Sequence, residues 1–176
     1  MWSMVSIGGT PFFGKLWTQT IGDRKMTQVD TEREDGDKNK VDDYDESKVY
    51  EEIKEKFGMD VVRFRRKSDG MALVQSDIDE VLKKVCLIYE NNNTFIQYQM
   101  EIQSENKSYA YDIEDKKVKR TQITVDGNKI DIIQYELDDG NEENVAQFAY
   151  EDVFYTINTT MEEADFKELL KNLYFF

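Results

Sequence analysis

The stretch that most constrains the fold runs from Val145 to Phe176 and combines two aromatic strands with one amphipathic helix. Val145–Tyr150 and Val153–Ile157 are rich in aromatic and β-branched residues, which favour a pleated, half-buried surface. The two residues between these segments, Glu151 and Asp152, predict a hairpin turn, although the glycine that such turns favour is missing. The end of the chain is therefore expected to supply two paired strands and an element that covers them.

A helix is predicted directly after this hairpin. Thr159 with Glu162, or Thr160 with Glu163, matches the capping box, in which two side chains satisfy the free N–H groups at a helix start. The apolar residues that follow recur at helical spacing and form one stripe, which we expect to pack on the sheet. The stripe consists of Phe166, Leu169, Leu170 and Leu173.

A second helix is predicted over Asp45–Phe57. Asp45 suits the N-cap position because its carboxylate accepts free backbone N–H groups. Gly58 suits the left-handed residue that ends many helices. The apolar side of this helix consists of Val49, Ile53 and Phe57, with Tyr50 beside them.

Strand patterns dominate the chain between the two helices. Thr94–Gln103 alternates most clearly: Ile96, Tyr98, Met100 and Ile102 are predicted to be buried, and Gln97, Gln99, Glu101 and Gln103 to face water. Residues 76–90 fit helical spacing as well as alternation, so both readings stay open there, with strands favoured. The other expected strands are Met71–Gln75, Lys84–Glu90, Ser108–Ile113, Val118–Val125 and Lys129–Leu137, with turns at Asn91–Asn93, Asp126–Gly127 and Asp139–Gly140.

These elements predict an α+β domain over residues 44–176. Strands joined by short turns favour an antiparallel, meander-like curved sheet. The N-terminal helix and the C-terminal amphipathic helix are expected to pack on that sheet, because each has one apolar side to bury.

Residues 1–43 differ from the rest of the chain. Met1–Trp17 is apolar but is interrupted by Pro11 and Lys15, so it is too short to span a membrane. We interpret it as a juxtamembrane-like segment, either the tail of a membrane anchor or a short helix around Phe12, Phe13, Leu16 and Trp17 that docks on the core.

A weak edge strand is expected at Met26–Glu32, followed by a charge-dense acidic loop to Asp45. The loop fails as a calcium-binding motif because, with Gly36 at the sixth position, Thr31 and Arg33 stand where acidic or amide oxygens are needed. A cation site without that motif remains an alternative among Asp35, Asp37, Asp42 and Asp43.

Charge and composition exclude several functions. The formal net charge of −14 argues against a nucleic-acid partner and against peripheral binding to anionic lipid, since both need lysine and arginine. The chain contains no histidine, which removes the Ser-His-Asp and Cys-His nucleophile systems and the usual zinc ligand sets. We therefore expect no cofactor.

Two enzyme readings remain weak. The acidic pairs Asp138–Asp139 and Glu151–Asp152 could serve acid–base hydrolysis, but a glycosidase needs two carboxyl groups at a defined distance across a cleft. Cys86, the single cysteine, lies in the apolar run VCLIY, where a buried and inert thiol is expected. We therefore expect a protein that is not an enzyme.

A binding surface can be proposed from arginine and tyrosine positions. The run VVRFRRK is the basic spot of an acidic chain, and as a strand it places Arg63 and Arg65 on one face. These arginines could hold a carboxylate or phosphate; alternatively, they protect a sheet edge or pair with acidic residues inside the protein. The tyrosines expected to line a groove with them are Tyr98, Tyr109, Tyr111 and Tyr135.

The order of motifs resembles a known family. A helix ending in glycine leads into VVRFRRKSDGMAL and CLIYENNNTFIQYQM, and later come the hairpin VDGNKIDIIQYE and the closing strand–helix pattern ending in EEADFKELLKNL. Over roughly Tyr44 to Leu173 this is similar to the domain-of-unknown-function family 4367. Members often have a proline where Arg66–Ser68 stands here.

The resemblance implies a place outside the cytoplasm, in secreted or single-pass proteins of anaerobic Gram-positive bacteria, some related to anti-sigma-factor regulators. It implies no catalytic residues. We therefore expect a non-catalytic extracytoplasmic binding or sensing domain, with an unknown protein, peptide or envelope component as partner and contact with a membrane only through an N-terminal anchor. The alternative is an assembly domain that pairs through a sheet edge; the oligomeric state stays open.

Overall fold

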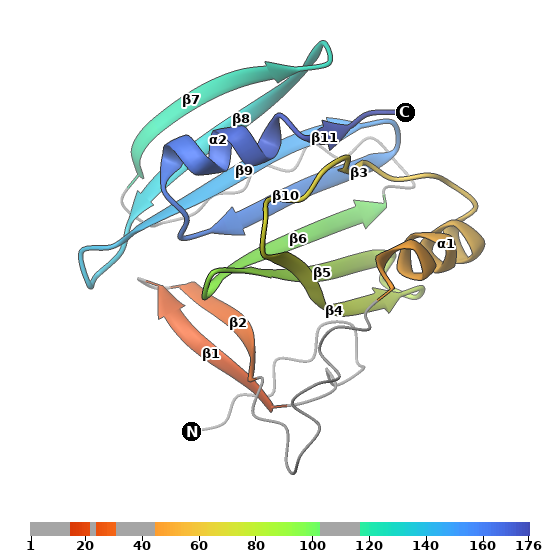
Figure 1. Cartoon of the computed structure of the whole chain (residues 1–176), viewed down its shortest axis with the longest axis horizontal. Helices are drawn as coiled ribbons and strands as arrows, with labels where there is room; N and C mark the ends of the chain where they lie inside the picture. Colours follow the sequence, from red (N-terminus) through yellow and green to blue (C-terminus); the bar gives the residue numbers. More distant parts are fainter. Residues whose placement is uncertain (1–14, 22–23, 31–44, 103–116) are drawn as a thin grey trace.

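The computed structural model describes residues 15–21, 24–30, 45–102 and 117–176, with side chains for 45–102 and 119–176 (Figure 1). Helices and strands are largely separate along the chain: α1 precedes the strands of the main sheet, and α2 follows them. In chain order they are β1 (Lys15–Ile21), β2 (Arg24–Asp30), α1 (Glu46–Phe57), β3 (Arg63–Phe64), β4 (Met71–Asp79), β5 (Lys84–Asn91), β6 (Thr94–Ile102), β7 (Lys117–Val125), β8 (Asn128–Glu136), β9 (Glu142–Tyr150), β10 (Val153–Thr159), α2 (Glu163–Leu170) and β11 (Leu173–Tyr174).

A seven-stranded antiparallel sheet forms the centre of the fold, in the order β4-β5-β6-β10-β9-β8-β7. It consists of two meanders, β4-β5-β6 and β7-β8-β9-β10, joined where β6 pairs with β10. The predicted α+β class and meander-like antiparallel sheet are confirmed. The sequence did not indicate the long-range β6–β10 pairing, because successive strands were expected to be neighbours.

Both helices pack on the same face of this sheet (Figure 1). Their buried residues belong to one core cluster with the alternating inward residues of β5, β6, β9 and β10. The predicted stripe of α2 is confirmed, since Phe166, Leu169 and Leu170 are buried, and Leu173 continues it into β11. Apolar burial on this face is the main stabilising term, as expected for a sheet covered by amphipathic helices.

The limits of α1 follow the predicted signals. The carboxylate of Asp45 accepts the N–H of Ser47 over 3.2 Å. Gly58 ends the helix with φ +68°, and its N–H bonds to the carbonyl of Lys54 over 2.8 Å. Val49, Tyr50 and Ile53 are buried, as the apolar spacing indicated.

The hairpin turns also match the sequence. Asn92 and Asn93 both have positive φ values, as do Asp126 and Gly127, which is the conformation of type I′ turns. Glu151 takes φ +50° in the turn before β10. Residues 76–90 form β4, a turn and β5, so the strand reading is the correct one.

The predicted capping box before α2 is wrong. Glu162 is the N-cap, and its side chain makes no capping hydrogen bond. Thr159 is still the last residue of β10, where its hydroxyl donates to the carbonyl of Phe95 and accepts the N–H of Met161, each over 3.1 Å. Glu163 is bound by the amino groups of Lys119 and Lys167, so it cannot reach back to a capping threonine.

Two further expectations, one for residues 1–43 and one for β6, need correction. Leu16 and Trp17 belong to β1, which pairs antiparallel with β2, so they are not helical; the β-branched residues that follow favour a strand. In β6, Gln97 is buried rather than wet, because β5 and β10 flank it and its amide donates to Sγ of Cys86 over 3.6 Å.

The predicted acidic loop, its aspartates Asp35, Asp37, Asp42 and Asp43, and the strand Ser108–Ile113 lie outside the described residues. Within the described parts of the chain, no helix has the length and apolar character needed to cross a bilayer.

Candidate functional site

The basic segment after α1 crosses the helical face of the sheet instead of joining its edge (Figure 1). Val61, Val62 and Phe64 are buried. The strand itself is only Arg63–Phe64 and pairs with β11, and a further bond runs from the N–H of Arg65 to the carbonyl of Asn172 over 2.6 Å. Because Phe64 points into the core, the alternation on β3 turns Arg63 outward.

The backbone of Val62 fixes this segment to the sheet. The hydroxyl of Tyr98 donates to the carbonyl oxygen of Val62 over 2.5 Å, and the hydroxyl of Tyr155 accepts the N–H of Val62 over 3.0 Å. A buried backbone group without a partner is costly, so these bonds hold the segment in place. The position of the neighbouring arginines therefore depends on the sheet beneath them.

A pocket of about 460 Å³ lies where α1, β3 and β11 meet. Three cationic side chains and one carboxylate line it, with two tyrosine rings and a phenylalanine. The charged residues are Arg63, Arg65, Lys67 and Glu46, and the rings belong to Tyr50, Phe64 and Tyr174. We call this cavity the basic pocket.

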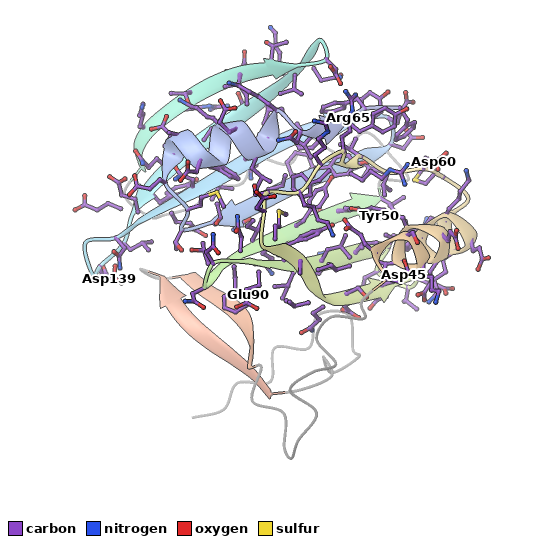
Figure 2. All side chains as sticks on the ribbon, viewed as in Figure 1. Asp45, Tyr50, Asp60, Arg65, Glu90 and Asp139 are labelled. Atoms are coloured by element: carbon purple, nitrogen blue, oxygen red, sulfur yellow. The ribbon has the colours of Figure 1, made fainter. Side chains whose placement is uncertain are left out.

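Each arginine of the basic pocket lies over a tyrosine ring. Figure 2 labels one residue of each pair, Tyr50 and Arg65. The guanidinium carbon of Arg63 is 5.9 Å from the ring centre of Tyr50, and that of Arg65 is 5.1 Å from the ring centre of Tyr174. Such cation–π contacts orient a guanidinium without neutralising it. Arg65 also meets Asp126 at 3.5 Å, in an exposed pair, which is weak because water screens it.

A hydrogen-bonded chain runs from the basic pocket into the core. Lys67 contacts one oxygen of Glu46 at 2.6 Å, and the hydroxyl of Tyr89 donates to the other over 2.7 Å. Because Tyr89 has a single proton, Tyr50, at 3.1 Å, must donate to it. Burial raises the pKa values of both Tyr50 and Tyr89, so both stay neutral and Glu46 keeps its place.

Of the predicted site residues, the structure brings the two arginines to one pocket and buries two of the tyrosines in the core. Arg63 and Arg65 are exposed and line one pocket, as their alternation suggested. Tyr98 and Tyr135 are buried, at 0% and 1% exposure, so the prediction that they line an open groove is wrong. Tyr98 lies on the core face of β6, and Tyr135 packs with Ile133 and Val145 on the opposite face of the sheet. Tyr109 and Tyr111 lie outside the described residues.

Sequence reasoning missed half of the basic pocket. Tyr174 follows the predicted helix, and Glu46, in the first turn of α1, was not considered as a site residue. Lys67 was part of the basic run but was not singled out. The usable signal was the position of Tyr50 beside the apolar stripe of α1, which places it where the helix meets the next element.

The residues considered for catalysis form no catalytic arrangement in the described parts. Asp138, Asp139, Glu151 and Asp152 are exposed on turns. The N–H of Asn141 donates to Asp139 over 2.9 Å and lowers its pKa, as in an ordinary Asx turn. Cys86 is buried, and burial raises the pKa of its thiol to about 12, so the inert-thiol reading fits.

Comparison with known proteins gives a family and no function. The DUF4367 family (Domain of unknown function) matches residues 61–173, from the basic segment to the start of β11, so the match does not include α1. Neither a curated protein nor a solved structure matches the chain. Since the match covers more than half of the sequence and runs through the whole seven-stranded sheet, this chain belongs to the DUF4367 family.

Proposed function

We propose that this chain is a non-catalytic binding domain whose ligand carries an anionic group, and that the basic pocket holds this group. The carboxylate or phosphate of such a ligand would lie between Arg63, Arg65 and Lys67. The aromatic rings of Tyr50 and Tyr174 would contact the apolar part beside it. A carboxylate at the end of a peptide and a phosphate of an envelope polymer present the same chemistry to these side chains.

The observation that carries the proposal is the concentration of cations in one concave place of a strongly acidic chain. The net charge is −14, yet three of the four charged residues that line the pocket are cationic. Arg63 makes no ion pair with the described residues and is held over a ring. An oriented guanidinium without a carboxylate partner is ready to accept one.

The edges of the sheet favour this reading over assembly through a strand. β4 carries a bulge between Leu73 and Gln75, and the register of β7 shifts between Lys117 and Lys119. Bulges and lysines at sheet edges oppose pairing with another strand. The alternative of assembly through an edge therefore has less support than ligand binding.

The proposal includes the location of the domain. We place it outside the cytoplasm, attached through an N-terminal anchor or secreted, and the support for this is the resemblance described for its sequence. Fractionation of cells that express the native gene, followed by antibody detection in the envelope and culture fluid, tests this part separately from the pocket.

A pair of peptides and a pair of variants test the binding proposal. The probes are a short aromatic peptide with a free C-terminal carboxylate, its C-terminal amide, and glycerol phosphate, each measured by calorimetry. Arg63→Glu is compared with Arg66→Glu, which makes the same charge change on an exposed neighbour that does not line the pocket.

We expect Arg63→Glu to weaken binding about tenfold, because it removes a charge-assisted bond and adds a repelling carboxylate. Arg66→Glu should change the affinity by less than about twofold, as exposed charges do. Binding of the free carboxylate alone, or of glycerol phosphate alone, identifies the source of the anion. Equal binding of the peptide and its amide, with no response to glycerol phosphate, contradicts the proposal.

A further inference from the structure

The register between β3 and β11 fixes the direction of the main-chain groups of β3. The N–H of Arg65 bonds to the carbonyl of Asn172. In the same register Arg63 lies opposite Tyr174. In an antiparallel pair every second residue exchanges both of its hydrogen bonds with the partner strand, and the residues between them direct theirs to the other side. Phe64 lies between Arg63 and Arg65, so its N–H and C=O point away from β11.

This side of β3 has a hydrogen-bonding capacity that the fold does not use. Val62 also directs its main-chain groups away from β11, and there the hydroxyls of Tyr155 and Tyr98 bind them. In the part of the chain that the structure describes, nothing binds the N–H or the C=O of Phe64. A main-chain group without a partner is costly when water is largely excluded, so this edge favours a ligand that supplies one donor and one acceptor.

The unused edge borders the basic pocket. Figure 1 shows β3 between β11 and α1, and α1 and residues 63–67 supply the whole lining of the pocket except Tyr174. The ring of Phe64 is turned to the core, where its centre is 5.5 Å from the ring centres of Tyr89 and Tyr98. Phe64 nevertheless lines the pocket and is 7% exposed, so the part of it that meets the pocket is its main chain.

An extended peptide supplies the matching groups. In antiparallel pairing a single ligand residue uses both groups of Phe64, which suits a pocket of about 460 Å³ that holds a short stretch of chain. The next ligand residue lies opposite Arg63, whose guanidinium has no ion-pair partner among the described residues. A terminal carboxylate on that residue meets the cations of the pocket. A phosphate group brings acceptors but no N–H donor for the carbonyl of Phe64.

We propose that the basic pocket binds the C-terminal end of an extended peptide, which adds to β3 as an antiparallel strand. This inference rests on the proposed binding of an anion and narrows the ligand to a peptide. The penultimate residue of the peptide exchanges two hydrogen bonds with Phe64, and the terminal carboxylate binds at Arg63 and Arg65. Main-chain pairing gives affinity for an extended chain, and the cations select its carboxyl end.

The test changes the ligand instead of the protein, because the groups in question belong to the main chain and the ring of Phe64 lies in the core. The probe is acetyl-Ala-Val-Tyr with a free carboxylate, measured on the full chain by calorimetry. N-methylation of its valine removes the N–H that donates to Phe64 and should weaken binding about tenfold. N-methylation of its tyrosine is the matched control: that N–H points away from β3, and the affinity should change by less than about threefold.

Amide hydrogen exchange supplies a second readout. Saturation with the unmethylated peptide should slow exchange at Phe64 about tenfold or more, because its N–H gains a partner. The N–H groups of Val62 and Arg65 are internal controls, since both are bonded within the fold, and their exchange should not change. Inorganic phosphate should leave exchange at Phe64 unchanged.

The outcomes separate this inference from the anion proposal. Equal affinities of the two methylated peptides, or unchanged exchange at Phe64 in the peptide complex, would overturn the inference. A preference for the free carboxylate over the C-terminal amide would in that case still support the binding of an anion. Binding of inorganic phosphate without binding of the peptide also excludes a peptide ligand and keeps the anion proposal. Binding of neither contradicts both.

Discussion

Tyr98 donates its hydroxyl proton to the carbonyl oxygen of Val62 over 2.5 Å, although the two residues lie far apart in the sequence. Tyr155 accepts the N–H of the same valine over 3.0 Å, and the two tyrosine rings are 5.9 Å apart. Two neighbouring strands of the sheet thus satisfy both backbone groups of one buried residue. Because Arg63 follows directly, the core of the domain positions the basic pocket.

The Tyr98→Phe and Tyr155→Phe variants should each lower the free energy of unfolding by about 1–3 kcal/mol, because each leaves one buried backbone group of Val62 without a partner. Urea unfolding measures the change. Tyr174→Phe is the control: its ring is half-exposed and the change should be within about 0.5 kcal/mol. If Tyr98→Phe is as stable as the native chain, the bond to Val62 does not hold the segment.

Alkaline pH should destabilise the protein. Burial raises the pKa of Tyr50, Tyr89, Tyr98 and Tyr155 above the ordinary value of 10.0, and that of Cys86 from 9.0 to about 12. The folded state therefore keeps protons that the unfolded chain loses, so the free energy of unfolding is fully present below about pH 9 and falls as the pH rises further.

Denaturant unfolding at a series of pH values, with tyrosinate absorbance recorded in parallel, checks this prediction. The buried tyrosines should ionise only as the chain unfolds. Ionisation of all tyrosines near 10.0 in a chain that remains folded would contradict the burial that raises these pKa values.

Leu170→Ala should cost about 2–5 kcal/mol of stability, because it opens a cavity beneath α2 where the native side chain is 0% exposed. Leu82→Ala removes the same atoms from a turn where the side chain is 53% exposed, and it should change stability by less than about 0.5 kcal/mol. Thermal unfolding of the two variants makes the comparison. Equal losses would show that α2 does not pack on the sheet.

Gly58→Ala should destabilise the protein by about 1 kcal/mol, because alanine at φ +68° takes the left-handed conformation that L-residues avoid. Nothing lies within 4 Å of an added Cβ at this position, so the cost is that of the backbone alone. Gly58→Asn should cost less, since asparagine tolerates this conformation. A neutral Gly58→Ala variant would contradict the observed end of α1.

Local signals in the sequence predicted most of the fold. Asp45 and Gly58 limit α1, the pairs Asn92–Asn93 and Asp126–Gly127 form tight turns, and the Leu169–Leu170 stripe is buried. Each of these depends on residues close together in the chain. The pairing of β6 with β10 could not be predicted in this way, because strand order depends on which edges meet after the hairpins have formed. The predicted capping box was wrong because the hydroxyl of Thr159 bonds to the carbonyl of Phe95 and the carboxylate of Glu163 binds Lys119. Both partners are distant in sequence, so the local pattern could not indicate them.

The candidate site was predictable only in part. Alternation within VVRFRRK indicated that Arg63 and Arg65 share a face, and the structure brings both to one pocket. It could not show that Tyr174 and Glu46 complete the pocket, because they come from opposite ends of the domain. Nor could it show that Tyr98 turns its hydroxyl towards the backbone of Val62, since a tyrosine on the apolar face of a strand suits either a groove or a core.

The central claim is that the basic pocket binds an anion, and chemical-shift mapping with inorganic phosphate tests it most directly. We predict that the amide signals of Ser47, Arg65 and Tyr174 shift together, that the shifts saturate, and that Arg63→Glu raises the phosphate concentration needed for saturation about tenfold while Arg66→Glu does not. Shifts spread over exposed lysines, or unchanged shifts in Arg63→Glu, would contradict the claim and leave the pocket as a structural junction between α1, β3 and β11.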